Sequence, residues 1–364
     1  MAFGLKLDEG RIGAQDFDPA RLNNPSAVGG VGFGIGLTQP IYSGGRLTAG
    51  RRAADSTAQA EAEAHESRRQ QLAAQVVRAY FGAQLASQAV RYAESSLAQA
   101  EETERFVRAR VEQQLLLESE ALRATAFRAQ REAELASARQ QAESARSAVE
   151  LLIGEPVTAA ALSSPVAVDA AVNASETASA AAAPRETPAM KAALLRSEAA
   201  HAAGQAARGS LLPEVFLQLG AETLRSSFSQ GDTWASALLG ARWQLSLGEL
   251  NTARAAEARS EAAASAARWQ QQQETREVAE ARGAIAAARS RIASAREAVT
   301  ASEAVRSLRA ARHREGLLPL TDLLDAETGL SAARTLLLQS QLEARVALAR
   351  LALASGQPVE GVAP

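Results

Sequence analysis

The 364-residue sequence contains no cysteine, two lysines and three histidines, and only 4% of its residues are aromatic. The absence of cysteine excludes disulfides, thiol catalysis and thiolate metal sites, but it leaves the compartment open. No window of about 18 predominantly apolar residues occurs, which argues against a transmembrane helix. A net charge of −2 argues against electrostatic binding of nucleic acid. The chain is instead rich in alanine, with 87 residues, and composition alone indicates a soluble helical protein.

Two patterns of apolar residues with a period of seven occur in the sequence, and the second begins 202 residues after the first. A small residue, almost always alanine, follows each member three positions later. The members are Val76, Ala83, Val90 and Leu97 in the first pattern, and Val278, Ile285, Ile292 and Val299 in the second. The shared offset predicts a tandem duplication, with one structural repeat at residues 1–154 and another at residues 187–356.

Each repeat contains a proline-free stretch that predicts an unusually long helix, residues 46–113 in the first and 249–315 in the second. At a rise of 1.5 Å per residue, either helix would span roughly 100 Å, which favours a coiled coil. Alanine at the second heptad position lets partner helices approach closely. We expect each long helix to turn and return as a shorter helix, so that residues 46–154 and 249–355 form two helical hairpins.

The segments outside the hairpins have other characters. Residues 187–209 predict a short helix that stacks end to end with a returning helix. Residues 155–186, rich in proline, serine and alanine, predict a linker that is partly disordered or loosely packed. Residues 357–364 form a C-terminal tail. The first repeat has no counterpart of the short helix, and the residues after Met1 lack the features of a signal peptide. We therefore expect the chain to be truncated at its N-terminus.

Four segments alternate between apolar residues and polar residues or glycine with a period of two, which predicts two β-hairpins, residues 2–45 and 212–247. Strands of about ten residues match a tilted crossing of a bilayer. Four strands cannot close a barrel, and an open edge in lipid leaves backbone groups unpaired, so several chains must share the strands. The alternative is two solvent-exposed hairpins. The residues expected to face lipid are Val31, Phe33, Ile35, Leu37, Leu217, Leu219, Leu239, Trp243 and Leu245.

The order of hairpins, linker and short helix resembles the TolC-like outer-membrane efflux proteins. Residues 39–46 (QPIYSGGR) resemble that family's strand-to-helix junction, and residues 211–214 (LLPE) are similar to its entry into the third strand. Residues 312–326 (RHREGLLPLTDLLDA) resemble its hairpin tip, and residues 151–154 (LLIG) match the usual end of its first repeat. The junction residues that carry the resemblance are Gln39, Pro40, Gly44, Gly45, Leu212, Pro213 and Gly248.

The resemblance implies a mixed α and β membrane protein and a homotrimer. Four strands per chain would form a twelve-stranded barrel in the outer-membrane lipid, continued by a helical tunnel into the periplasm. The protein would be a passive exit duct of a tripartite efflux or type I secretion system. Its partners would be a periplasmic adaptor (membrane fusion) protein and an inner-membrane efflux pump or ABC exporter.

The resemblance also implies where the adaptor docks, at the tips of the two helical hairpins. The first tip departs from the family pattern, since Gln114 replaces the usual glycine, and Leu117 and Glu118 stand where the second tip has Pro319 and Leu320. For each leucine, core packing at a hairpin turn is an equal alternative. The predicted docking residues are Gly316, Leu317, Thr321, Asp322 and Leu323 in the second tip, with Leu115, Leu116, Ser119, Glu120 and Leu122 in the first.

An enzyme is the first alternative function, and the sequence argues against it. The three histidines fall in separate helical stretches without a second ligand at metal spacing, so neither a metal site nor a catalytic triad is expected. The glycines at 32, 34 and 36 lie in a strand pattern rather than at the start of a helix, so no dinucleotide cofactor is expected. A coiled-coil scaffold protein stays open, although it does not explain the alternating segments. An adaptor protein would need further β-domains that are not visible.

Overall fold

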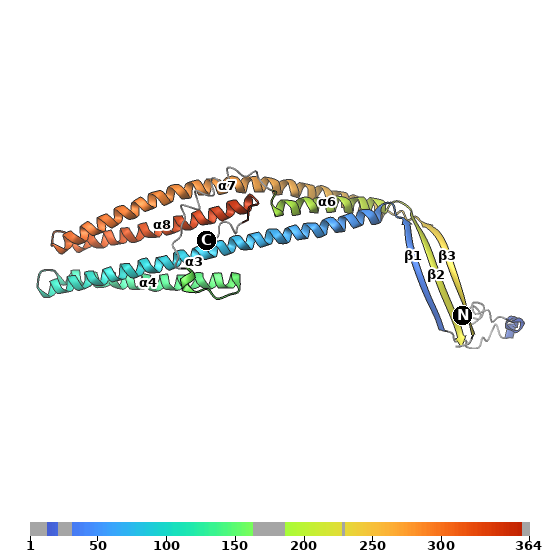
Figure 1. Ribbon diagram of the computed structural model, residues 1–364, viewed down its shortest axis with the longest axis horizontal. Helices are drawn as coiled ribbons and strands as arrows, with labels where there is room; N and C mark the ends of the chain where they lie inside the picture. Colours follow the sequence, from blue (N-terminus) through green and yellow to red (C-terminus); the bar gives the residue numbers. More distant parts are fainter. Residues whose placement is uncertain (1–12, 21–30, 163–185, 228–229, 359–364) are drawn as a thin grey trace. The chain divides into compact units, whose positions relative to one another are not determined.

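The computed structural model describes residues 13–20, 31–162, 186–227 and 230–358. It is mostly helical and contains a small antiparallel sheet (Figure 1). The strand predicted before residue 13 lies outside the described residues, as do most of the linker and the end of the tail. Among the helices of the described ranges, none combines the length and the apolar character that a membrane crossing requires.

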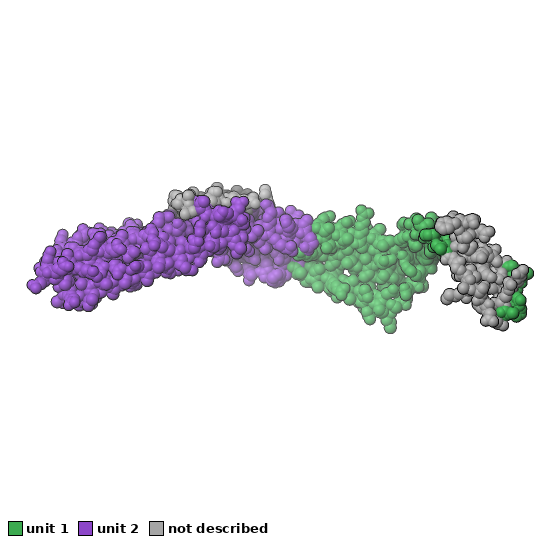
Figure 2. Space-filling model, turned by 90° about the horizontal axis from the view of Figure 1, so that it is seen from below, with its two compact units in different colours: residues 1–59, 194–266 green, residues 60–193, 267–364 purple. Residues whose placement is uncertain are grey.

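The chain divides into two compact units, shown in different colours in Figure 2. The first unit comprises residues 1–59 and 194–266, and the second comprises residues 60–193 and 267–364. Each unit therefore takes residues from both sequence repeats. The sheet lies in the first unit, whereas the ends of the helical hairpins lie in the second.

Four helices form two hairpins. Helix α3 (Arg46–Glu112) is followed by α4 (Glu118–Ile153), and α7 (Leu247–Arg314) is followed by α8 (Leu320–Ala354). The outgoing helices have 67 and 68 residues and the returning helices 36 and 35, so the two hairpins are nearly equal in length. Their bounds lie within a few residues of those predicted from the absence of proline.

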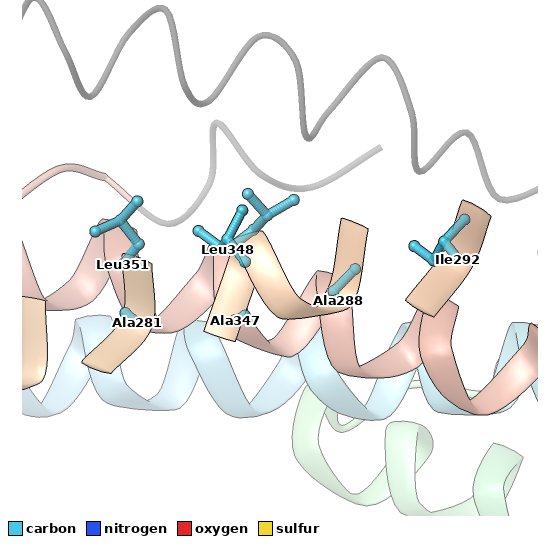
Figure 3. Packing of buried hydrophobic residues seen from close by; sticks show 8 residues of the cluster. Ala281, Ala288, Ile292, Ala347, Leu348 and Leu351 are labelled. Carbon is cyan, nitrogen blue, oxygen red and sulfur yellow. The ribbon is translucent and has the colours of Figure 1, made fainter. Parts of the chain in front are cut away.

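The second hairpin is held together by alanine and large aliphatic residues (Figure 3). On α7, Ile285 and Ile292 are each 4% exposed and occupy predicted heptad positions. The alanines three residues later, Ala288 and Ala295, are fully buried. Because alanine leaves a small knob, α8 can approach α7 closely along this line. The prediction that alanine serves close helix packing is confirmed here. The α8 residues of this cluster are Ala344, Ala347, Leu348 and Leu351.

Helix α3 is buried on two faces, which its heptad pattern did not predict. Val77 and Phe81 pack against Ala349 and Ala352 of α8, in the other hairpin. Separately, Ala83 lies in a cluster with residues of α4 and of the segment that follows it. The sequence could not distinguish these faces, because a two-helix seam and a seam shared by three helices have the same period.

The first part of the linker is packed against the helices, which corrects the expectation of a loose segment for residues 155–162. Leu162, in the short helix η2 (Ala159–Leu162), is only 4% exposed. The hydroxyl of Tyr80 donates to the carbonyl of Ala161 at 3.0 Å, and the backbone N–H of Val157 donates to Glu150 at 3.0 Å. These contacts dock the start of the linker on α3 and α4.

Helix α6 (Pro188–Gly209) begins at a complete N-cap. The backbone N–H of Met190 donates to the hydroxyl of Thr187 at 3.0 Å, and Pro188 occupies the first helical position, where no N–H donor is needed. The Thr187 hydroxyl in turn donates to the carboxylate of Glu274 on α7. The cap therefore both starts α6 and attaches it to α7.

The sheet has three described strands in the order β1 (Val31–Tyr42), β2 (Glu214–Ser227) and β3 (Gln230–Arg242), all antiparallel. Strand β1 comes from the first repeat and pairs directly with β2 of the second repeat. The two repeats therefore share one sheet, a pairing that the sequence pattern did not predict. The short helix η1 (Ala14–Phe17) is the only regular element described before β1 within residues 13–30.

Candidate functional site

The register of the sheet gathers the large apolar side chains on one face. Leu37 lies opposite Leu219, and Leu217 lies opposite Leu239. Directly paired residues point to the same side, and alternate residues share that side, so these four fall on one face with the odd-numbered residues of β1. In the described chain that face is open: Val31, Phe33, Ile35 and Leu37 are 59–77% exposed. An apolar surface of this extent marks a contact with lipid or with another protein.

Two residues predicted for this face lie outside the strand ladder. Strand β3 ends at Arg242, so Trp243 and Leu245 belong to the connection before α7, and both are exposed. The indole N–H of Trp243 donates to the carbonyl of Leu211 at 3.1 Å, which holds the ring against the entry to β2. The alternation continued in the sequence beyond the point where backbone pairing stops, because alternation alone does not report hydrogen bonding.

The opposite face carries small and polar residues, with one aromatic side chain that the pattern left unexplained. Phe216 is paired with Gly240, and its ring lies over that glycine. A Cβ atom at Gly240 would come within 2.6 Å of the ring. An aromatic residue that covers a strand glycine replaces the packing that the glycine lacks. The cross-strand register was needed to identify this pair.

The first strand-to-helix junction is a tight turn of two glycines. Gly44 and Gly45 have φ angles of 60° and 78°, in the left-handed region that favours glycine. Gly44 also lies against the carbonyl of Gly209 at the end of α6, and a Cβ atom on Gly209 would be 2.6 Å from the carbonyl of Gly44. The motif predicted the first two glycines, whereas Gly209 was missed because its partner is distant in sequence.

The other predicted junction residues of this repeat surround the turn. Gln39 and Pro40 belong to the end of β1, where a bulge falls between Pro40 and Tyr42. Leu212 packs on Gly44, and Pro213 immediately precedes β2. A proline that precedes a strand and a proline beside a bulge both avoid the need for a ladder donor.

The second junction uses a different device. The hydroxyl of Ser246 accepts from the backbone N–H of Glu249 at 3.2 Å, and the Glu249 carboxylate accepts from the backbone N–H of Ser246 at 3.3 Å. This reciprocal pair is a capping box, which the Ser-x-x-Glu spacing could have revealed. Gly248, predicted as a junction glycine, instead lies in the first turn of α7. The capping box starts the helix without a left-handed glycine, so the Gly-Gly form is not needed.

An arginine on each side of Glu214 ties the junction to the sheet. Arg46, the first residue of α3, lies 3.4 Å from one carboxylate oxygen, and Arg242, the last residue of β3, lies 2.9 Å from the other. Glu214 is 21% exposed, so each pair contributes less than about 1 kcal/mol in isolation. Their geometric role is to link the start of α3 to strands of the other repeat.

The two hairpin tips have the same backbone design. Gln114 and Gly316 both adopt positive φ angles, 61° and 78°. The residue after each donates to the carbonyl five positions earlier, Leu115 to Arg110 and Leu317 to Arg312, both at 2.9 Å. This pattern is a Schellman cap, which ends a helix at a left-handed residue. The glutamine in the first tip therefore adopts the conformation that the family's glycine would adopt.

The predicted docking residues divide by exposure. Leu115, Leu122 and Leu317 are 58–72% exposed, and Gly316 and Ser119 are also exposed. Leu116, Glu120, Thr321 and Asp322 are half-buried. Leu323 is only 4% exposed, which corrects its assignment to the docking surface. Leu117, which was not selected, is 72% exposed.

Side chains of the two tips meet in the second unit. The guanidinium of Arg110 donates to the carbonyl of Arg314 at 3.0 Å, and the ring of Phe106 contacts His313 edge to face with centroids 5.7 Å apart. Leu320 of α8 is buried in a cluster with residues of α3 and α4. A groove of about 540 Å³ runs between the tips, lined by both turns. The two predicted half-sites therefore form one continuous surface.

Behind the tips lies a pair of buried charged residues. Glu327 on α8 is 4% exposed and lies 3.3 Å from Arg306 on α7. Burial raises the pKa of Glu327, and the positive charge of Arg306 opposes this rise less strongly. No group of three metal-ligating side chains occurs in the part of the chain that the structure describes.

The fold places the chain in a class of outer-membrane channel structures with long helices. The chain is similar to CusC (20% identity, TM-score 0.78), with 92% of this chain and 79% of that chain covered. It is also similar to VceC of Vibrio cholerae (19%, 0.76), with 99% and 92% covered. The outer-membrane channel MtrE of Neisseria gonorrhoeae (20%, 0.73) is covered to 86%, over 98% of this chain.

The sequence itself assigns the family. A model of the outer membrane efflux protein family matches residues 16–155 and 179–357, and the chain belongs to that family. No curated protein sequence matches the chain significantly.

Proposed function

We propose that the protein is the outer-membrane exit duct of a tripartite efflux or type I secretion system. It would conduct substrates passively, in series with a periplasmic adaptor and an inner-membrane efflux pump or ABC exporter. The observation that carries this proposal is the aligned apolar face of the sheet, on a chain of the outer membrane efflux protein family.

The sheet supports a location in the outer membrane. Its apolar face exposes aliphatic and aromatic side chains, and its other face carries glycine and polar groups, which is the pattern of a barrel with a water-filled interior. Strands of 12 to 14 residues exceed the nine to eleven that a tilted crossing needs. The described strands cannot close a barrel alone, so we propose a homotrimer with twelve shared strands.

The helical hairpins support a tunnel in the periplasm. Helices of 67 and 68 residues reach roughly 100 Å at 1.5 Å per residue. Such a length serves to cross an aqueous compartment rather than to build a globular core. The exposed leucines of the tips offer apolar anchors to the end of another helical hairpin, a recurring mode of helix recognition. We propose that the adaptor contacts this surface, without Leu323.

The docking surface is tested by replacing two exposed leucines of the tips, Leu115→Asp and Leu317→Asp, in one variant. Charges at desolvated anchor positions should abolish adaptor binding and lower export by more than tenfold. Leu151→Asp is the matched control, because Leu151 is 84% exposed but lies at the other end of α4. Trimer content is followed by gel electrophoresis without heating.

Full export by the tip variant would contradict docking at the tips, provided that its trimers are intact. Recovery of the wild-type protein as a soluble monomer, outside the membrane fraction, would contradict the duct itself.

A further inference from the structure

A cavity of about 730 Å³ lies between the two helical hairpins in the second unit. Its walls come from three helices: α3 and α4 of the first hairpin and α8 of the second (Figure 1). A volume of this size is in the range of small-molecule sites. The tip groove described above is a separate feature, and none of the predicted docking residues lines this cavity.

Two charged side chains of the wall have polar atoms without partners. Arg131 is 2% exposed and Glu327 is 4% exposed. The Nε atom of Arg131 and the Oε2 atom of Glu327 are buried and make no hydrogen bond. Their other atoms are engaged: Arg131 contacts Glu134 at 2.6 Å and donates to Thr328 at 3.3 Å. A buried polar atom without a partner is costly, so one donor and one acceptor in this wall require a complementary group.

The shape of the cavity argues against a helix as its occupant. Along α3, its lining runs from Ala89 to Gln99, roughly 15 Å at the helical rise. The volume then corresponds to a cross-section of roughly 50 Å², whereas an α-helix with side chains occupies about 80–110 Å². An extended chain fits better, because strands pack about 4.8 Å apart and sheets about 10 Å apart. Roughly 15 Å accommodates about four extended residues.

The chemistry of the lining selects an uncharged amide chain. The cavity contains two arginines, Arg131 and Arg334, and two glutamates, Glu134 and Glu327, so its formal charge balances. The remaining polar lining consists of side-chain amides and hydroxyls, which donate and accept equally well. These residues are Ser96, Gln99, Gln130, Ser137, Gln141, Thr328, Ser331, Thr335 and Gln339.

We propose that this cavity binds a short, uncharged peptide of about four residues in an extended conformation. An amide N–H of the peptide would donate to Oε2 of Glu327, and an amide carbonyl would accept from Nε of Arg131. Because the walls belong to both hairpins, the bound peptide would fasten α8 to α3 and α4. The binding itself is independent of the proposed export function.

The test is calorimetric titration of the purified protein in detergent with N-acetyl-tetraglycine N-methylamide. A second ligand of the same shape has esters in place of its two central amides and therefore lacks their N–H donors. We expect saturable binding of the amide and at least tenfold weaker binding of the ester, because Glu327 then loses its donor. Bound peptide should also raise the unfolding midpoint.

Variants locate the site. Ser96→Leu fills the cavity from α3 and should abolish binding, whereas Ala98→Leu, an exposed neighbour outside the lining, should retain it. Ser331→Leu fills the same space from α8 and keeps the test decisive should the first variant fail to fold. The proposal is overturned by the absence of saturable binding up to about 10 mM peptide, weaker than any specific site of this size. Equal affinity for the amide and the ester, or wild-type affinity in both cavity-filling variants, would overturn it as well.

Discussion

Arg306 and Glu327 form a buried ion pair at 3.3 Å between α7 and α8, and the equivalent positions of the first repeat have the opposite polarity. There, 202 residues earlier, Glu104 lies on the outgoing helix and Thr125 on the returning helix, and the hydroxyl of Thr125 donates to Glu104 at 2.7 Å. The duplicated hairpins therefore keep the position of a polar contact while exchanging which helix supplies the acid. Each hairpin satisfies its own buried acid, so neither depends on the other for this contact.

Glu327 is expected to make stability depend on pH. Burial raises the pKa of its carboxyl above the usual 4.5, so the folded protein binds this proton more tightly than the unfolded chain. Its contribution is then complete below pH 4.5 and is lost as the pH rises through the raised folded pKa. Glu327→Gln mimics the protonated form, so the wild type should lose stability relative to this variant on going from pH 4 to pH 8. Unfolding midpoints of both proteins across this range measure the difference, and a difference independent of pH would contradict the burial effect.

The left-handed residue of the first tip should be improvable. Gln114 adopts φ 61°, which costs a residue with a Cβ atom about 1 kcal/mol relative to glycine. We expect Gln114→Gly to stabilise the protein by up to about 1 kcal/mol, seen as a higher unfolding midpoint. Gly316→Ala is the converse variant and should destabilise by a similar amount, since Gly316 occupies the same conformation with open space around it. Destabilisation by Gln114→Gly would mean that the glutamine side chain has another role.

The two glycines of the first junction should differ in sensitivity. Gly45→Ala adds only the strain of a positive φ, about 1 kcal/mol. Gly44→Ala adds the same strain and a clash with the backbone carbonyl of Gly209, so it should prevent the junction from closing. The measurement is the yield of folded protein in membranes together with its thermal stability. Equal behaviour of the two variants would show that the contact between Gly44 and Gly209 is not essential.

The capping box of the second junction should contribute measurably to the start of α7. Ser246→Ala removes the hydroxyl that accepts from Glu249, and loss of such a cap costs about 0.5–2 kcal/mol. Ser246→Thr retains a hydroxyl at the same place and serves as the control. Hydrogen exchange in the first turn of α7 reports on the cap directly. Exchange that is unchanged in Ser246→Ala would show that the sheet connection, rather than the cap, starts the helix.

Much of the architecture follows from periodicity and from the absence of proline. The long helices, their turns and the apolar face of the strands were predictable, because they depend on local patterns. The pairing of β1 with β2, the contact between Gly44 and Gly209, and the second buried face of α3 were not, because each joins residues far apart in sequence. Leu323 shows the same limit: its spacing resembles a docking motif, but only the packing of α8 decides that it points inward.

The candidate cavity had no sequence signal at all. Its polar residues come from three helices, and on each of them serine and glutamine read as an ordinary solvated surface. The unpartnered atoms of Arg131 and Glu327 appear only once the helices are assembled.

The central claim, that the sheet forms a barrel wall in lipid, can be tested because the chain has no cysteine of its own. Single cysteines are placed at Phe33, Gly34, Ile35 and Gly36, and the two glycines have room for the new side chain. Native membranes are then treated with a charged maleimide. The account predicts labelling at positions 34 and 36, which would face water in the barrel, and protection at positions 33 and 35 until the protein is denatured. Equal labelling at all four positions, or protection of the glycine positions, would contradict it.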